Sequence, residues 1–303
     1  MNYRHAFHAG NFADVHKHLV LLSLLERLQR KPKPLFYLDT HAGRGMYDLR
    51  GEAASRSGEW RHGIGRLMDL HPANEDLCRY LDAVRAVQTV PREPPARYPG
   101  SPLLAAGQLR AEDRIVLVEK QIQEAQALEE AVGRRRGLAV VCGDGYAAMK
   151  TYLPPRENRG LVMIDPPYES DGEFAGAQQA LQAGLRRWPN GMFALWYPIK
   201  ATPEAARLRA GLQGSGLRKL LRVELHLHPT DSPLRLNGSG LIIANPPWQF
   251  DTQILPALQD AAAALTLEAA VEPPRGIGTA ATDARPASPG HHPSAVVEWL
   301  AGE

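Results

Sequence analysis

The stretch GLVMIDPPY, residues 160–168, decides the fold, because a short unbroken apolar run ends directly in Asp-Pro-Pro-Tyr. Runs of this length, bounded by turn-forming residues, are typical of strands that are buried on both faces of a parallel sheet. Six more runs of this kind, with helical stretches between most of them, lie at residues 35–40, 114–119, 138–144, 191–198, 223–228 and 240–248. The alternation predicts an α/β domain in which helices cover a mostly parallel sheet.

The last two of these runs, residues 223–228 and 240–248, have only a loop between them. A loop of that length cannot hold the crossover that parallel strands need, so an antiparallel pair at one edge of the sheet is predicted. A mostly parallel seven-stranded sheet with an antiparallel edge pair is the layout of the class I, Rossmann-like methyltransferase fold. A last short strand is expected at AVVEWL, residues 295–300.

Two regions interrupt the alternation of strands and helices. Residues 48–99 lie between the first and second strands, and they are mostly polar and too long for one crossover helix. We therefore predict an inserted helical subdomain within a single domain of residues 1–303, with helices at residues 58–70 and 74–87. Residues 272–292 are rich in Pro, Gly, Ala and Ser, a composition that predicts a flexible loop.

Composition sets broad limits on function. The chain has 303 residues, 44% of them hydrophobic, a formal net charge of +2 and a sequence pI of about 8.5. That charge neither requires nor excludes a polyanionic partner, which needs only a local basic face. No apolar run could cross a bilayer and no signal peptide is evident, so we expect a cytoplasmic protein without a membrane partner. Cys78, Cys142 and the eleven histidines show no metal-ligand spacing, so no metal is expected.

Asp165, Pro166 and Tyr168 carry the predicted chemistry. Ligands of open α/β sheets bind beyond the carboxyl ends of the strands, where this tetrapeptide is expected. The lone pair of an exocyclic amine is conjugated into its base, and two acceptors, the Asp165 carboxylate and the Pro166 carbonyl, would direct it toward a methyl donor. Tyr168 offers a flat ring for a base that has been flipped out of its stack. We therefore predict methyl transfer to the N6 of adenine in a nucleic acid, with Asp165 as the cap of a following helix as the structural alternative.

Three other strand ends supply what S-adenosylmethionine would need. The first strand enters a glycine-bearing turn, residues 39–45, where a ligand can approach the backbone closely. The second strand ends in Glu119, at the position that binds ribose hydroxyls, and Asp144 after the third could accept the adenine amine of the cofactor. Each acid alone is more often a helix cap, but their order on successive strands predicts a cofactor site.

Asn245-Pro246-Pro247-Trp248 also fits the pattern of amino-group methyltransferases, because Asn can replace Asp and Trp can replace Tyr. Its strand is predicted to be antiparallel, so its carboxyl end would lie at the opposite edge of the sheet from the cofactor. We therefore expect this second motif to have a structural role.

The N-terminal segment is dense in groups that bind phosphates or stack on bases. They are Tyr3, Arg4, His5, Phe7, His8, Lys17 and His18. A helix that starts near Asn11 would place Asp14 and His18 on one face. A helix with a solvated polar face explains the same pattern equally well.

Four specific motifs follow one another along the chain. They are YRHAFHAGNFADVHKH at residues 3–18, YLDTHAGRG at 37–45, YPGSPLL at 98–104 and IDPPYE at 164–169. Together they resemble the bacterial 23S ribosomal RNA adenine-N6 methyltransferase family called RlmJ, and the similarity extends over nearly the whole chain. The first two motifs are highly specific to that family, whereas DPPY is shared by all adenine-N6 enzymes.

The resemblance implies a cofactor, a substrate and a set of site residues. S-adenosylmethionine would be bound by His18, Lys17, His41, Gly43, Ser101, Glu119, Asp144 and Gly145. The catalytic residues would be Asp165, Pro166 and Tyr168, and the RNA contacts would be Tyr3, Arg4 and His5. The family carries the inserted helical subdomain and is expected to act as a monomer on 23S ribosomal RNA that is still free of ribosomal proteins.

The residues alone leave two other functions open. An adenine methyltransferase that acts on DNA would carry the same DPPY motif. A DNA-binding protein that serves the use of external DNA, without methyl transfer, would bind no cofactor. The basic clusters at residues 134–136 and 218–219 could face a nucleic acid or form solvated surface.

Overall fold

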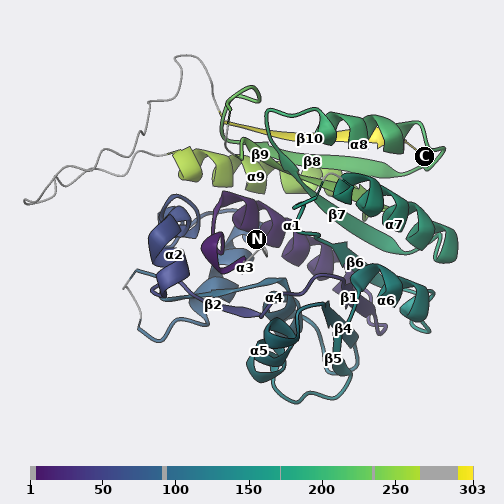
Figure 1. The fold of residues 1–303 in the computed structure, drawn as a ribbon, viewed down its shortest axis with the longest axis horizontal. Helices are drawn as coiled ribbons and strands as arrows, with labels where there is room; N and C mark the ends of the chain where they lie inside the picture. Colours follow the sequence, from purple (N-terminus) through teal and green to yellow (C-terminus); the bar gives the residue numbers. More distant parts are fainter. Residues whose placement is uncertain (1–4, 91–93, 171, 234–235, 267–292, 303) are drawn as a thin grey trace, which may run out of the picture.

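The computed structural model describes residues 5–90, 94–170, 172–233, 236–266 and 293–302, and its centre is an eight-stranded sheet (Figure 1). The strands lie in the order β10-β8-β9-β7-β6-β1-β4-β5. Their bounds are β1 Phe36–Asp39, β4 Arg114–Glu119, β5 Leu138–Cys142, β6 Gly160–Ile164, β7 Met192–Ile199, β8 Leu220–His226, β9 Gly238–Ala244 and β10 Ser294–Ala301. All seven apolar runs that the sequence predicted as strands lie in this sheet.

Five neighbouring strands, β5, β4, β1, β6 and β7, run parallel, and β9 is antiparallel to both β7 and β8. The predicted antiparallel pair is therefore confirmed. The sheet has eight strands rather than the expected seven, because the last strand expected at residues 295–300 joins it as β10, antiparallel to β8, with Ser294 opposite His226. Pairing with β10 satisfies backbone groups that β8 would otherwise expose at the edge of the sheet.

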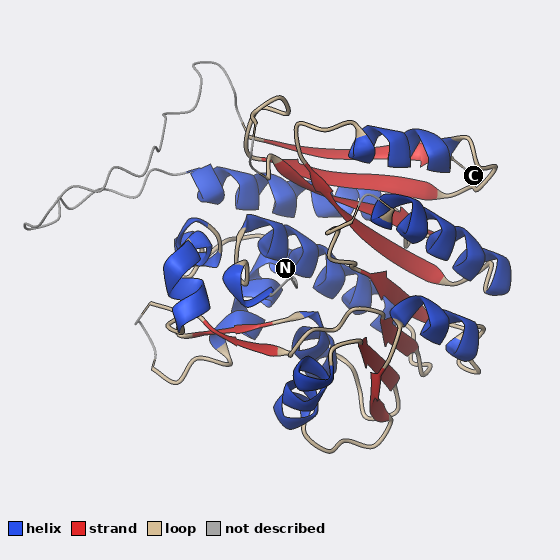
Figure 2. Cartoon of the chain, viewed as in Figure 1, coloured by secondary structure: helices blue, strands red, loops and turns tan. Residues whose placement is uncertain are grey.

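Alternate residues of the central strands face two helical layers, one on each side of the sheet (Figure 2). In β1, Tyr37 packs into one hydrophobic core, whereas Phe36 and Leu38 pack into the other. The first layer contains α1 (Phe12–Gln29), α3 (Glu75–Arg85), α4 (Ser101–Gln108), α5 (Ile122–Val132) and α9 (Phe250–Thr266). The second contains α6 (Gly145–Tyr152), α7 (Glu173–Arg187) and α8 (Glu204–Gln213).

Helix α1 lies inside the molecule, and every residue from Ala13 to Leu25 is buried. It packs against α3, α4 and α9 as well as β7 and β9, which explains why so much of its circumference is apolar. Asn11 caps its N-terminus, since the Asn11 side chain accepts hydrogen bonds from the N–H groups of Ala13 and Asp14. The predicted helix start near Asn11 is confirmed.

The segment between β1 and β4 combines short helices with a small sheet. It contains β2 (Met46–Asp48), α2 (Glu52–Ser57), two short 3₁₀ turns (Glu59–His62 and Ile64–Arg66), α3, β3 (Arg97–Pro99) and α4. Strands β2 and β3 pair antiparallel and form a two-stranded sheet that the sequence did not predict. The apolar side chains of this segment, among them Ile64, Leu77 and Tyr80, belong to the same hydrophobic core as α1.

The helix expected at residues 58–70 is wrong, because glycines divide that stretch into the two 3₁₀ turns. Gly58 has a φ of +64°, a conformation that ends a helix. A Cβ on Gly63 would lie 2.1 Å from the carbonyl oxygen of Gly10, so the backbone there must stay bare. The helix expected at residues 74–87 is confirmed as α3, and the loop expected at residues 272–292 lies outside the described residues.

Within the described part of the chain, no helix combines the length and the apolar character that crossing a membrane requires.

The burial of α1 predicts a large cost for removing one of its apolar side chains. Leu24 is fully buried, so Leu24→Ala should lower the free energy of unfolding by about 2–5 kcal/mol in urea denaturation. Ile122 at the start of α5 is 66% exposed, so Ile122→Ala should change it by about 0.5 kcal/mol or less. Equal losses in the two variants would contradict this packing.

Candidate active site

The carboxyl ends of the parallel strands meet at one cavity of about 1270 Å³. In the order of the sheet, Lys200 follows β7, Asp165 follows β6, Asp39 ends β1, Glu119 ends β4 and Asp144 follows β5. Side chains from the N-terminal segment and α1 line the same cavity. The structure therefore brings the predicted catalytic motif, the predicted cofactor residues and the N-terminal motif into one site.

Lys17 of α1 reaches the end of β6 and pairs with Asp165. Its Nζ lies 2.6 Å from Asp165 Oδ2 and 3.0 Å from Asp14 Oδ1, and its side chain is only 5% exposed. Burial opposes the charged ammonium, but the two carboxylates outweigh it and raise the pKa of Lys17. Lys17 therefore stays charged and fixes one oxygen of Asp165.

Asp14 connects Lys17 to the N-terminal segment. Its Oδ2 accepts hydrogen bonds from His5 Nε2 at 2.9 Å and from the N–H of Gly10 at 3.0 Å. Burial opposes ionisation of Asp14, but His5 and Lys17 hold its pKa well below the usual value. His5, expected to contact RNA, thus lies in a chain of contacts that ends at Asp165, whereas residues 3 and 4, Tyr3 and Arg4, lie outside the described residues.

Asp165 does not cap a helix. Helix α7 begins only at Glu173, with Gly172 at the N-cap, so the structural alternative for Asp165 is wrong. The two prolines that follow Asp165 line the cavity with it. Lys17 holds Asp165 Oδ2, whereas Oδ1 has no hydrogen-bond partner among the described residues.

Tyr168 is held at the wall of the cavity by aromatic neighbours. Its hydroxyl donates to the carbonyl oxygen of Trp196 at 2.6 Å. Its ring centroid lies 4.4 Å from that of Phe174 and 5.7 Å from that of Trp196. Lys17 Nζ lies 5.5 Å from the Trp196 ring centroid, so Trp196 contacts both Tyr168 and the ammonium that holds Asp165.

Asp39 is a fully buried carboxylate for which the sequence pattern indicated only the start of a turn. Its Oδ2 accepts hydrogen bonds from Ser101 Oγ at 2.7 Å and from the Tyr37 hydroxyl at 3.0 Å. Burial raises the pKa of Asp39 to about 6, against the effect of these two hydrogen bonds. Ser101, expected at the cofactor, is therefore also the residue that joins α4 to the end of β1. The signal that could have found Asp39 was an acid closing an apolar strand, the same signal that identified Glu119.

Glu119 shapes the glycine-bearing turn after β1. Its carboxylate accepts hydrogen bonds from the N–H of Gly43 at 2.9 Å and from the N–H of Gln121 at 2.7 Å. The side chain lines the cavity although Glu119 is only 8% exposed. Glu119 is thus fixed in position by two strand ends, as a carboxylate that binds hydroxyls must be.

Asp144 and Gly145 form the turn after β5. Asp144 Oδ1 accepts from the N–H of Ala147 and caps α6, so the helix-cap interpretation holds for one of its two oxygens. A Cβ on Gly145 would lie 2.0 Å from the carbonyl oxygen of Thr40. Glycine is therefore required at residue 145 for the turns after β1 and β5 to approach each other.

His18 and His41 line the cavity as neutral imidazoles. Burial lowers the pKa of His18 to about 3 and that of His41 to about 4. His18 Nδ1 lies 2.7 Å from the Tyr98 hydroxyl, and the His41 ring packs edge-on against Tyr146. Neither residue brings a positive charge to this end of the cavity.

The residues at this end fit S-adenosylmethionine. Glu119 and Asp144 supply carboxylates suited to ribose hydroxyls and an amine, and the neutral His18 and His41 do not repel a sulfonium charge. The buried hydroxyl of Tyr146 has no hydrogen-bond partner among the described residues, and a polar ligand would satisfy it. Across the residues that the structure describes, no group of three or more His, Cys, Asp or Glu side chains could hold a metal ion.

Asn245 of the second Pro-Pro motif lies at the opposite edge of the sheet, as predicted. It follows β9, whose last residue, Ala244, pairs with Phe193 near the start of β7. Its Nδ2 donates to the carbonyl oxygens of Pro189 and Gly191, each at 2.8 Å. The side chain thus holds the loop before β7, which is the structural role that strand direction predicted.

The raised pKa of Asp39 predicts how stability depends on pH. In the folded protein this pKa is about 6 against a usual 3.8, so in that interval the folded state holds a proton that the unfolded state has lost. Asp39 therefore reduces stability as the pH rises through the interval. The measurement is the free energy of unfolding of the wild type and of Asp39→Asn in urea denaturation. The wild-type value minus the variant value should fall by roughly 1–3 kcal/mol between about pH 4 and about pH 7. A difference that is constant, or that grows with pH, would contradict the assignment.

Known proteins resemble this chain over most of its length. The family model described as Ribosomal RNA large subunit methyltransferase D, RlmJ, matches residues 32–271. Ribosomal RNA large subunit methyltransferase J of Haemophilus influenzae is 40% identical over 261 residues, which cover 85% of this chain and 92% of that protein. The protein of the same name from Escherichia coli K12 is 38% identical over 255 residues, 84% of this chain and 90% of that protein. A crystal structure of a protein from Legionella pneumophila has a TM-score of 0.80 and 30% identity, and the match covers 96% of this chain and 98% of that one. The chain has the α/β, Rossmann-like methyltransferase fold and belongs to the RlmJ family of ribosomal RNA large subunit methyltransferases.

Proposed function

We propose that this protein transfers a methyl group from S-adenosylmethionine to the N6 of an adenine in 23S ribosomal RNA. The observation that carries the proposal is the position of Asp165. It lies at the carboxyl end of β6, in the cavity lined by Glu119 and Asp144, with one carboxylate oxygen held by Lys17. Family membership supports ribosomal RNA as the substrate and does not favour the DNA alternatives.

The end of the cavity at the carboxyl ends of β1, β4 and β5 is proposed to hold the cofactor. Glu119 would bind the ribose hydroxyls, Asp144 the adenine amine, and Ser101 and His18 would complete the wall. When bound, S-adenosylmethionine supplies a methyl group activated by a sulfonium. The chain itself positions the acceptor, and holding two reactants in line removes several kcal/mol from a barrier.

Asp165 and the Pro166 carbonyl are proposed to prepare the acceptor amine. An adenine N6 has two N–H groups and a lone pair that is conjugated into the ring. Asp165 Oδ1, which Lys17 leaves open, would accept one N–H, and the Pro166 carbonyl would accept the other. The lone pair would then point at the methyl group. As the new C–N bond forms, the N–H proton becomes acidic, and Asp165 would take it.

The cavity wall suits a base that has left its stack. Tyr168 would provide the flat face, because its ring is fixed by Phe174 and by its hydrogen bond to Trp196. An adenine inside a helix cannot enter such a recess, so a flipped or unpaired nucleotide is required. We propose that the RNA is modified while free of ribosomal proteins, which would otherwise block entry.

One chain is proposed to act as a monomer in the cytoplasm. All the residues assigned to the reaction come from a single chain, so the proposed chemistry needs no second copy. The cytoplasmic location follows from the proposed substrate, since bacterial ribosomal RNA is made there.

Transfer of a labelled methyl group tests the proposed substrate. The wild-type protein should label deproteinised 23S ribosomal RNA and leave double-stranded DNA of the same concentration unlabelled. Label in DNA instead would support a DNA methyltransferase. No label in either nucleic acid, together with no binding of S-adenosylmethionine in calorimetry, would refute the proposal.

Asp165→Ala tests the proposed proton acceptor. It should reduce kcat by about 100-fold or more, because positioned acid–base groups contribute that much. The Kd for S-adenosylmethionine should stay within about threefold of the wild type, since Glu119 and Asp144, the carboxylates proposed to bind the cofactor, lie on other strands. Asp260→Ala, which removes an exposed carboxylate on α9, serves as the matched control and should change neither value. Lost cofactor binding in Asp165→Ala, or undiminished transfer, would exclude the assigned role.

A further inference from the structure

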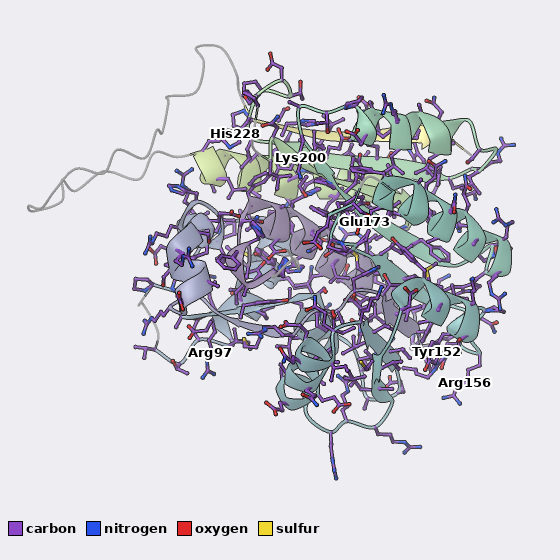
Figure 3. The ribbon with its side chains drawn as sticks, viewed as in Figure 1. Arg97, Tyr152, Arg156, Glu173, Lys200 and His228 are labelled. Carbon is purple, nitrogen blue, oxygen red and sulfur yellow. The ribbon has the colours of Figure 1, made fainter. Side chains whose placement is uncertain are left out.

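We propose that Lys200 and His228 form a phosphate-binding subsite for the RNA backbone beside the target adenosine. The inference rests on the proposed function and deepens it, because it assigns the part of the cavity that the cofactor and the acceptor base do not use. Both residues line the cavity that contains Asp165. Figure 3 labels both residues in the same region of the molecule, together with Glu173, which lines the same cavity.

Strand order separates this subsite from the cofactor. Lys200 follows β7, which is the neighbour of β6, and His228 follows β8, two strands farther along the same edge. Glu119 and Asp144 lie on the other side of Asp165, at the ends of β4 and β5. Neighbouring strands are about 4.8 Å apart, so the two ends of the cavity are well separated. A nucleotide whose base reaches Asp165 would therefore extend its phosphates toward β7 and β8.

One residue fixes the backbone of both loops. The N–H of the buried Asn237 donates to the carbonyl of Ile199, directly before Lys200, at 2.8 Å. The carbonyl of Asn237 accepts from the N–H of Leu227 at 3.1 Å and from that of His228 at 3.0 Å. The starting points of the two side chains are thus held relative to each other before any ligand binds, which lowers the entropic cost of binding.

Charge favours a polyanion at this end. Lys200 is exposed and forms no ion pair with any residue in the described ranges, unlike Lys17. Glu59, Glu169 and Glu173 also line the cavity. His8 and Asn11 bind Glu59 at 3.0 Å, and Glu169 and Glu173 follow β6 rather than β7 or β8. The cofactor end carries several carboxylates and would repel a phosphate.

His228 can donate a hydrogen bond to a phosphate oxygen in either protonation state, because a neutral imidazole keeps one N–H. Its ring stands edge-on to Phe12 at the start of α1, with the centroids 6.4 Å apart. A lysine ammonium and an imidazole that line one cavity match a phosphodiester, which offers one negative charge and several acceptor oxygens. The ligand is therefore the RNA backbone, read without regard to base sequence.

The test is the affinity of the protein for a 23S ribosomal RNA transcript, measured by filter binding at several salt concentrations. Lys200→Ala and His228→Ala should each raise the Kd for RNA about threefold or more, and Lys200→Glu should raise it further. The slope of log Kd against log salt should fall by about one for each phosphate that the variant no longer binds. The Kd for S-adenosylmethionine should not change.

Arg156→Ala is the matched control, because Arg156 is an 83% exposed cation in the loop before β6, at the other edge of the sheet (Figure 3). It should leave both the Kd for RNA and its salt slope unchanged. An unchanged Kd in Lys200→Glu and His228→Ala, or an equal loss in Arg156→Ala, would overturn the subsite. Wild-type protein that binds the transcript but never methylates it would refute the proposed function, and the binding data would still decide the subsite.

Discussion

The buried ion pair between Lys17 and Asp165 is the interaction on which the rest of the site depends. Burying an isolated ammonium costs several kcal/mol, and only well-placed opposite charges offset that cost. Asp14, from the same helix, and Asp165, from the end of β6, supply those charges at 3.0 Å and 2.6 Å. The pair therefore binds the first helix of the chain to the predicted catalytic loop. The apolar side chains of α1 bury this helix inside the molecule, where the sheet covers one side of it and the segment between β1 and β4 covers another.

The order of the strands divides the cavity by chemistry. Carboxylates and neutral imidazoles gather at the ends of β1, β4 and β5, where a cationic methyl donor fits. Lys200 follows β7 and His228 follows β8, and these two residues form the proposed subsite for a polyanion. Asp165 lies between the two ends, after β6. A methyltransferase must bring a positively charged donor and a negatively charged acceptor strand to one point, and this separation allows both to bind without either entering the wrong end.

Local patterns in the sequence predicted most of the sheet and the catalytic edge, because apolar runs and strand direction are local properties. Strand direction alone placed Asp165 in the cavity and Asn245 at the opposite edge, and the structure agrees.

The contact between Lys17 and Asp165 joins residues 148 positions apart, and no local pattern signals it. The role of Asp39 was not predicted, because its partner Ser101 comes from a distant helix. Residues 58–70 were predicted to be helical, whereas the close approach at Gly63 that helps to prevent this depends on a distant part of the chain. The eighth strand was predicted, but its place in the sheet depends on pairing with β8.

The central claim is that the amine held by Asp165 is the N6 of adenine, and the identity of the methylated nucleoside tests it most directly. Deproteinised 23S ribosomal RNA would be methylated by the protein, digested completely to nucleosides and analysed by mass spectrometry against authentic standards. We predict N6-methyladenosine as the new nucleoside. A new methyl group on a ring nitrogen or on a ribose hydroxyl would contradict the account, because neither acceptor offers the two N–H groups that Asp165 and the Pro166 carbonyl are proposed to accept. A new methyl group on the exocyclic amine of cytosine or guanine would contradict the assignment of adenine.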